Sequence, residues 1–527
     1  MRHRGFTTMA CAGLLLTACT SQAASGGSDT GYVTDGTATI AVDADPGALN
    51  PLTNTTTAGT AISSLAYDHL VSRTLGDKSF RGELASAWTV TPTRATFTLR
   101  KDATCSDGSA ITPTVVARTF DWVLNTKNAS PWLGAYIPEG SKVTADDAAG
   151  TLTVTAPTSG SFLLENLSYM PILCGAGADD PAKLTEKTSG SGMYQLASAD
   201  PGQTYTFTLR KDYTWGADGA SAKDKGVPAK VVVKVVPNEA TRANLLTAGT
   251  VNLATVGGAD RDRLDRGNFT KADVKADPAL LFYNQAAGRA TADSTVRTAL
   301  AQALDLRALG SVATGGRGTA LKTIVTGEPA VCSYDAVTGN LPTGGLKAAA
   351  AALDAAGWKT GGGAIRTKNG KQLGINVLYP SNRGSDLVSA VELLQTQWSK
   401  LGVKVRLTGS DSYATTLFTG GDWDVVWAPF STEDPSVWKI LVAGQAPPKG
   451  RNFASVDNTT YQAETSEAEK IAGSSSCPLW KNAEAALVKD ADLTPIEANS
   501  KTIYGSHVTF EVGQLGTVKG SSIRLTK

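Results

Sequence analysis

The sequence predicts an α/β fold with two lobes and an extra subdomain packed on the first lobe. The chain has 527 residues, which is too many for one ordinary hydrophobic core. Its second half alternates strand and helix patterns, whereas its first half is richer in strands separated by turns. Apolar residues make up 41% of the chain and charged residues 18%, which is typical of a folded globular protein.

The first half opens with a strand pattern at residues 37–43, which turn residues follow. Residues 58–72 carry apolar side chains at helical spacing, and residues 95–100 alternate apolar and polar side chains as a half-buried strand does. Residues 112–124 predict a helix, because a threonine followed by a proline suits a helix start. Residues 230–236 form a further apolar strand pattern.

The second half alternates helices and strands. We expect helices at residues 294–309 and 386–401, where apolar side chains recur on one face. We expect strands at residues 373–379, 403–407 and 423–427, which are short and rich in β-branched residues. Strands separated by helices in this way predict a largely parallel sheet.

The N-terminus has the pattern of an export signal. Arg2 and Arg4 form a short basic region, an apolar run covers residues 10–16, and small residues precede Cys19. This pattern resembles a bacterial lipobox, in which the cysteine after the cut is lipidated and two acyl chains give stable membrane anchoring. We therefore expect a signal peptide at residues 1–18 and a lipid on Cys19. The alternative is an ordinary secretory signal with a chance cysteine.

Residues 19–31 are rich in Ser, Ala and Gly without an apolar period, so we expect a flexible tether there. Beyond it the chain has four cysteines, an even number that suits disulfides in an oxidising compartment: Cys105, Cys174, Cys332 and Cys477. Four cysteines allow three pairings. A metal site is disfavoured, because none of the four has a CxxC spacing or a nearby histidine.

The sequence contains no recognisable catalytic machinery. Of its three histidines, His3 lies in the signal region, and His69 and His507 are isolated. Residues 436–439 fit the S-x-x-K pattern of penicillin-binding enzymes, but no KTG element follows. We expect no enzymatic activity, no catalytic residue, no cofactor and no metal. The net charge of +1 also gives no indication of a nucleic-acid surface.

Seven phrases along the chain resemble, in order, those of the large family-5 extracytoplasmic solute-binding proteins, the oligopeptide and dipeptide binders of ABC importers. No single phrase is specific, but their number and order are. The phrases are Glu83–Trp88, Phe97–Gly108, Ser189–Tyr194, Arg242–Val251, Val296–Asp305, Leu353–Trp358 and Asp424–Pro435. The sequence departs from the family pattern at Cys105, where the family has Phe, at Met193, where it has Pro, and in the aromatic-rich segment before Pro435.

This resemblance implies a two-lobed periplasmic-binding-protein-like fold of the class II, cluster C type. Lobe I would comprise residues 32–71, 189–281 and 495–527, with the extra subdomain at 72–188 packed on it. Lobe II would comprise residues 282–494. Among the three disulfide pairings we favour Cys105–Cys174 with Cys332–Cys477, because each then closes within one proposed lobe.

The resemblance also implies a ligand site between the lobes. In the family an acidic residue of the second lobe pairs with the free α-amine of a peptide, and Asp434 matches its position beside Glu433. The alternative is that Asp434 only caps the helix beginning at Pro435. The remaining candidates are aromatic or polar side chains that would line the cleft: Phe430, Trp427, Trp438, Tyr67, Asn284 and Trp215.

The expected partners are a small-molecule or peptide solute and the permease subunits of an ABC importer. We expect an extracytoplasmic monomer that touches the membrane only through the N-terminal lipid and binds no nucleic acid. Two alternatives remain open: an oligosaccharide or another small solute as ligand, and a sensor of signal peptides that is not coupled to import.

Overall fold

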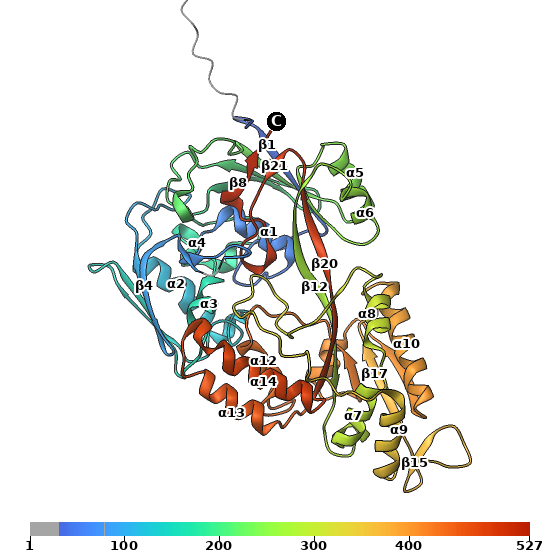
Figure 1. Cartoon of the computed structure of the whole chain (residues 1–527). Helices are drawn as coiled ribbons and strands as arrows, with labels where there is room; N and C mark the ends of the chain where they lie inside the picture. Colours follow the sequence, from blue (N-terminus) through green and yellow to red (C-terminus); the bar gives the residue numbers. More distant parts are fainter. Residues whose placement is uncertain (1–30, 78) are drawn as a thin grey trace, which may run out of the picture.

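Two long antiparallel strands run down the middle of the molecule and connect its two halves (Figure 1). They are β12 (Thr270–Tyr283) and β20 (Leu493–Gly505). The computed structural model describes residues 31–77 and 79–527, and within them the largest sheet has 11 strands. The sheet extends from these two strands in both directions, and β13 (Thr319–Ala320) pairs with β20 off its main path.

On the β20 side, the sheet continues through five strands that belong to the first half of the chain. In order they are β11 (Leu253–Val256), β1 (Thr37–Val42), β10 (Lys230–Val235), β9 (Thr204–Leu209) and β8 (Tyr194–Asp200). β1 is parallel to both of its neighbours, and the other pairs are antiparallel. Val231 and Val233 point into the core while Lys230 and Lys234 stay exposed, which is the alternation of a strand with one buried face.

On the β12 side, the sheet continues through β19 (Val425–Trp427), β17 (Gly374–Tyr379) and β18 (Lys404–Gly409). These three strands are mutually parallel, and the helix α10 (Ser385–Lys400) connects β17 to β18. The α/β fold and the parallel sheet predicted for the second half are therefore confirmed.

The single helix predicted at residues 294–309 is two helices in the structure. α7 (Ser294–Gln302) ends at Ala303, and α8 (Leu306–Ala313) begins after Asp305. The Asp305 side chain accepts a hydrogen bond from the backbone N–H of Ala308 at 3.0 Å. Asp305 is therefore an N-cap that starts a new helix, although the apolar period continues through it.

A second, four-stranded sheet lies at the left of Figure 1. Its order is β4 (Ala85–Thr91), β5 (Arg94–Leu99), β7 (Thr151–Thr155) and β6 (Lys142–Asp146). The helix α2 (Pro113–Leu124) packs against β6 and β7, and Thr112 caps its first turn as the sequence predicts. This sheet shares one continuous hydrophobic core with the first half of the large sheet.

Further helices lie around the two halves of the large sheet (Figure 1). They are α1 (Thr57–Ala66), α5 (Glu239–Thr247) and α6 (Asp260–Leu264) in the first half, and α9 (Gly345–Ala355), α13 (Thr459–Ala468) and α14 (Cys477–Lys489) in the second. No helix in the part of the chain that the structure describes is both long and apolar enough to cross a membrane.

The two central strands contact different hydrophobic cores along their length. In β12, Val274 packs on the core of the first half, whereas Ala279 and Leu281 belong to a core of the second half. In β20 the same change occurs between Ile503 and Ile496. Between these positions the pairing of β12 with β20 is irregular. The main cores of the two halves are therefore separate, and β12 and β20 pass from one to the other.

Both disulfides favoured from the sequence are present, Cys105–Cys174 and Cys332–Cys477, with Cα atoms 5.8 and 5.6 Å apart. The expected signal peptide at residues 1–18, the lipidated Cys19 and nearly all of the tether lie outside the described residues.

Candidate functional site

The segment that leads from β19 to the helix α12 (Ser436–Val442) carries two adjacent carboxylates, Glu433 and Asp434. Backbone hydrogen bonds fix this segment against residues 327–331. Gly327 donates to the carbonyl of Thr432 at 2.7 Å, and Val331 donates to the carbonyl of Glu433 at 2.9 Å. The two carboxylates are therefore presented by a loop that is itself held in place.

Asp434 is completely buried, with an exposed fraction of 0%. Its Oδ1 accepts hydrogen bonds from the backbone N–H of Ser436 at 2.7 Å and from the Ser436 hydroxyl. Its Oδ2 has no hydrogen-bond partner among the described residues. Burial raises the pKa of this carboxyl above its ordinary value. Asp434 thus stabilises the start of α12 with one oxygen and leaves the other buried and unused.

Aromatic side chains of the first half face this acidic pair. The Tyr136 hydroxyl donates to Glu433 Oε2 at 3.3 Å. The Tyr136 ring lies 5.2 Å from the Trp132 ring and 5.0 Å from the Tyr169 ring, measured between centroids. Contacts at these distances are favourable tilted packing. The three rings therefore form a continuous aromatic wall beside Glu433 and Asp434.

A third carboxylate belongs to the same site. Glu165 lies in the short helix α3 (Leu163–Ser168) and is 7% exposed. Burial raises the pKa of Glu165 to about 7 and that of Glu433 to about 7, and the charge of Asp434 contributes to both shifts. The guanidinium of Arg73 acts in the opposite direction on all three carboxyls. Three carboxyl groups around one guanidinium make this site favourable for a cation above about pH 7, where Glu165 and Glu433 are ionised.

These raised pKa values predict a pH dependence. A carboxyl with a raised pKa holds its proton more tightly in the folded state, so its stabilisation is complete below about pH 4.5 and is lost as the pH rises through about 7. We expect the melting temperature of the ligand-free protein to fall over this window, and to fall less in Glu165→Gln. Equal slopes for the two proteins in scanning calorimetry would contradict this. Glu484, whose pKa is also about 7, contributes equally to both slopes.

A pocket in the first half adjoins the aromatic wall and shares Trp132 and Tyr169 with it. Tyr67, one of the predicted ligand residues, lines this pocket, and its hydroxyl accepts a hydrogen bond from the N–H of Ser189 at 3.1 Å. Other polar side chains that line this pocket are Asn54, Ser63, His69, Gln514 and Lys519. Of the remaining predicted residues, Tyr67 is therefore the one that lines this pocket.

Four predicted aromatic residues do not line this cavity. Trp438 stacks on Phe282 at 5.6 Å and donates to the carbonyl of Ile324 at 3.1 Å. Trp427 is 2% exposed in the core beside β12. Trp215 is 1% exposed and donates to Asp68 Oδ2 at 2.9 Å.

Phe430, the fourth, packs on Tyr413 and Phe453. Trp215, Trp427 and Trp438 are buried in the hydrophobic cores, and Phe430 is half-buried against one of them. The four side chains therefore pack on cores and do not line the pocket that contains Tyr67.

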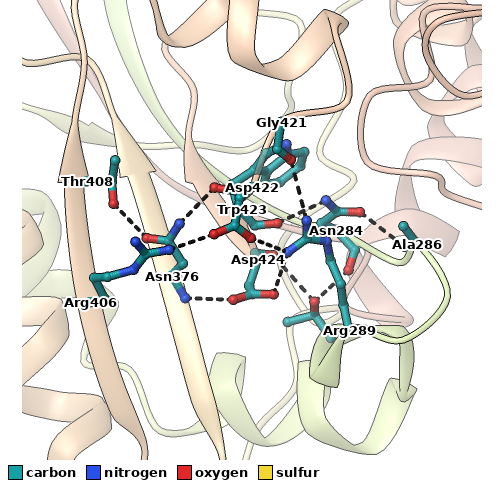
Figure 2. A network of polar contacts seen from close by, with 11 residues as sticks. Asn284, Ala286, Arg289, Asn376, Arg406, Thr408, Gly421, Asp422, Trp423 and Asp424 are labelled. Atoms are coloured by element: carbon teal, nitrogen blue, oxygen red, sulfur yellow. Dashed lines mark hydrogen bonds and ion pairs between the residues drawn. The ribbon is translucent and has the colours of Figure 1, made fainter.

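Asn284 belongs to a different polar network, which Figure 2 shows. Its side-chain amide donates to the carbonyl of Trp423 at 3.0 Å, and its Oδ1 accepts from the N–H of Ala286 at 3.1 Å. In the same network Asp424 pairs with Arg289 at 3.0 Å and accepts from the N–H of Asn376 at 2.7 Å.

This network ties together the amino ends of the parallel strands, whereas Asp434 follows the carboxyl end of β19. Asn284 is therefore placed as a structural residue rather than beside Asp434.

The sequence analysis missed Trp132, Tyr136, Glu165, Tyr169 and Arg73. Two signals were available in the sequence. Trp132 and Tyr136 lie four residues apart in a segment with Pro and Gly, outside any helix or strand pattern. Glu165 interrupts an apolar run, and a charged residue in such a run is a candidate for function.

No group of His, Cys, Asp and Glu side chains within residues 31–77 and 79–527 is arranged to hold a metal ion. The site instead offers a buried carboxylate oxygen, further carboxylates and an aromatic wall. This arrangement suits the binding of a cationic organic group.

A family model described as "Bacterial extracellular solute-binding proteins, family 5 Middle" matches residues 79–447. Among curated relatives, the "Probable peptide-binding protein YejA" of Agrobacterium fabrum is 30% identical over 190 residues, which cover 32% of this chain and 29% of that protein. Protein XP55 of Streptomyces lividans is 27% identical over 385 residues, which cover 70% of this chain and 66% of that protein. The matched regions thus span less than two thirds of either relative.

Among solved structures, the chain resembles a substrate-binding protein from Microbacterium hydrocarbonoxydans that was crystallised with 4-hydroxybenzoate hydrazide. The two are 26% identical, the TM-score is 0.70, and the match covers 93% of this chain and 100% of that one. The family model matches more than half of the chain, and the observed two-lobed fold is consistent with it. The chain belongs to the family-5 bacterial extracellular solute-binding proteins.

Proposed function

We propose that this protein binds a solute with a cationic amine, foremost a peptide, between its two lobes outside the cell and delivers it to an ABC importer. The observation that favours an amine in the ligand is the Oδ2 of the fully buried Asp434, which has no hydrogen-bond partner among the described residues. A buried carboxylate oxygen without a partner is costly, so a matching donor stabilises it strongly. A ligand ammonium group would supply that donor together with a positive charge.

The neighbouring carboxylates support a charged ligand over a neutral sugar. An aromatic wall such as Trp132, Tyr136 and Tyr169 suits either class. A sugar hydroxyl, however, carries no positive charge to offset Glu165, Glu433 and Asp434 when they are ionised. Peptides are the first choice within the amines because the relative YejA is described as a probable peptide-binding protein.

We infer that the lobes close on the ligand by bending where the two cores meet. This proposal retains the division of the chain into lobe I (residues 32–71, 189–281 and 495–527), the extra subdomain (residues 72–188) and lobe II (residues 282–494). The irregular pairing between Ala276 and Leu280 in β12 is a suitable place for bending, because it lies between the cores.

Several contacts across the lobes would have to break on opening. The Ser161 hydroxyl donates to the carbonyl of Ala468 at 2.7 Å and accepts from Trp480 Nε1 at 3.1 Å. Arg73 donates to the carbonyl of Pro329 at 2.7 Å. These contacts join the subdomain at residues 72–188 to the second lobe, so the structure corresponds to a closed arrangement in this proposal.

The cellular setting is proposed from the N-terminal sequence. Arg2, Arg4 and the residues up to Cys19 support export and lipid anchoring, which would hold a monomeric receptor beside the permease subunits of its importer. A receptor for signal peptides would share the site and the anchor. Uptake of labelled peptides by cells that lack the protein separates the two roles, because only an import component reduces uptake when it is deleted.

The solute class can be tested on the purified protein. We expect native mass spectrometry of protein purified from its own host to show a bound mass that denaturation releases, and fragmentation of that compound to reveal a free primary amine. A released compound without an amine, such as a neutral oligosaccharide, would contradict the proposal.

A further inference from the structure

The loop that joins β7 to α3 reaches from the subdomain at residues 72–188 into the second lobe. Ser161 and Phe162, at the end of this loop, are each only 1% exposed. Its base is held within the subdomain, because the N–H of Gly160 donates to the carbonyl of Pro92 at 2.9 Å. Phe162 is therefore positioned by one lobe and buried by the other.

The second lobe buries Phe162 in a small apolar socket. The buried side chains around it are Cys332, Ala468 and Trp480, and the ring centroids of Phe162 and Trp480 lie 6.0 Å apart. The disulfide Cys332–Cys477 ties one side of the socket to the start of α14. The socket therefore stays formed when Phe162 leaves it, and a preorganised site binds its occupant at a lower entropic cost.

Hydrogen bonds surround this apolar contact. The Ser161 carbonyl accepts from the N–H of Gly473 at 2.6 Å, and the Ser161 hydroxyl bonds to the Ala468 carbonyl and to Trp480 Nε1. These polar groups can bind water when the lobes separate, so breaking their hydrogen bonds costs little net free energy. Water offers no such replacement for the buried ring of Phe162, which therefore contributes most to the stability of the contact.

The subdomain is otherwise part of the first lobe. Its buried apolar side chains belong to the continuous core of the first half, and among the described residues only Phe162 belongs instead to a cluster with the second lobe. Burial of one phenylalanine side chain changes an equilibrium constant by about 10- to 100-fold. A contact of this size can open and close, and a ligand can shift its equilibrium.

We propose that Phe162 is a positioning residue for lobe closure, a latch whose insertion between Cys332 and Trp480 stabilises the closed state without contacting the solute. This inference rests on the proposed function, in which the lobes close on a solute. A solute enclosed by the lobes leaves only after the latch opens. The latch should therefore act on the dissociation rate of the solute more than on its association rate.

The latch also adjoins the acidic site. Glu165 follows Phe162 by three residues, and a Cβ atom placed on Gly473 would lie 3.8 Å from Glu165 Oε1. Closure thus brings the Glu165 carboxyl against the second lobe, where, besides burial, the charge of Asp434 raises its pKa. Without a solute this repulsion favours open lobes, whereas the latch favours closed lobes. A cationic solute removes the repulsion and leaves the latch to hold the closed state.

The test uses the full chain and Xaa-Ala dipeptides as the probe. Phe162→Ala removes the ring, and Phe162→Leu keeps a smaller apolar side chain in the socket. Leu164→Ala is the matched control, because Leu164 lies two residues away and packs on the core of the first half. Stopped-flow fluorescence measures the association and dissociation rates of the dipeptides. Hydrogen exchange without dipeptide measures the protection of residues 469–480, which include Gly473 and Trp480, and thermal unfolding checks that each variant is folded.

We expect the dissociation rate to rise by about tenfold or more in Phe162→Ala, while the association rate stays within about threefold of wild type. Residues 469–480 should exchange about tenfold faster in this variant, because the latch is open for a larger share of the time. Phe162→Leu should lie between Phe162→Ala and the wild-type protein, and Leu164→Ala should match wild type within about threefold. A purely structural role of Phe162 would lower the melting temperature and leave the dissociation rate unchanged.

An unchanged dissociation rate or unchanged exchange of residues 469–480 in Phe162→Ala overturns the inference and leaves the proposed function intact, as does an equal effect in Leu164→Ala. If the wild-type protein binds no dipeptide, the proposed function fails for peptides, and the exchange of residues 469–480 alone decides on the latch. If Phe162→Ala fails to fold, the same measurements on Phe162→Leu decide, since wild-type values there also overturn the inference.

Discussion

Replacing Asp434 by Asn should weaken the binding of amine-bearing solutes by about 100-fold or more while the protein stays folded. Removing one partner of a buried ion pair costs about 3–5 kcal/mol, which corresponds to a factor of that size in affinity. The variant keeps Oδ1 and can still accept from the N–H of Ser436. Local structure at the start of α12 should therefore survive, and only the charge is removed.

The same change should leave the ligand-free protein as stable as before or more stable. In the absence of ligand the buried Oδ2 of Asp434 has no partner, and the raised pKa of this carboxyl reflects the cost of its charge. Opposite effects on affinity and on stability distinguish a binding residue from a purely structural cap. A cap would lose stability and leave affinity almost unchanged.

Titration calorimetry with Xaa-Ala dipeptides measures the first effect, and thermal unfolding without ligand measures the second. Asp422→Asn is the matched control, because Asp422 is a largely exposed carboxylate of the same lobe, at the edge that carries the Asn284 network. Affinities within about threefold of each other for the wild-type protein and Asp434→Asn would refute the assignment.

The parts of the fold that the sequence predicts are those with a local period. The strand at residues 373–379 and the helix at 386–401 are observed as Gly374–Tyr379 and Ser385–Lys400, because their apolar side chains repeat at strand and helix spacing. The split at Asp305 was missed because the apolar period runs through a capping residue. Capping depends on one hydrogen bond, which periodicity does not detect.

Residue type alone was a poor guide to the residues of the candidate site. Asp434 was chosen because it matches the position of the family's acidic residue, and in the structure one of its carboxylate oxygens has no partner among the described residues. Trp427 and Trp438 were singled out as aromatic, but aromatic residues serve cores and clefts equally well, and here both are in cores. Tyr136 meets Glu433 only through the fold, across 297 residues of the chain. No local sequence pattern predicts such a contact.

A second large effect is expected for stability rather than binding. Arg297 of α7 pairs with Asp492 at 3.1 Å, and their side chains are only 6% and 3% exposed. Arg297 also donates to four backbone carbonyls, those of Ala491, Thr291, Ala292 and Asp490. Replacing Arg297 by Met leaves Asp492 buried without its cation and several carbonyls without a donor. We expect a loss of about 3–5 kcal/mol in the free energy of unfolding.

Urea unfolding followed by tryptophan fluorescence measures this loss, and Arg406→Met provides the comparison. Arg406 pairs with Asp422 at 2.7 Å in the same lobe, but the two side chains are 64% and 71% exposed. Such a pair contributes about 0–1 kcal/mol because water competes for both charges. A loss in Arg297→Met no larger than in Arg406→Met would show that the buried pair does not hold the second lobe together.

The two large effects should also be separable. Arg297 lies in the lobe that carries Asp434, but it bonds to the turn after α14 and not to the loop before α12. The folded fraction of Arg297→Met should therefore bind dipeptides with wild-type affinity, whereas Asp434→Asn stays folded and loses them. If each variant loses only one of the two properties, Asp434 contributes to the free energy of binding at the interlobe site, and Arg297 contributes to the free energy of unfolding within the second lobe.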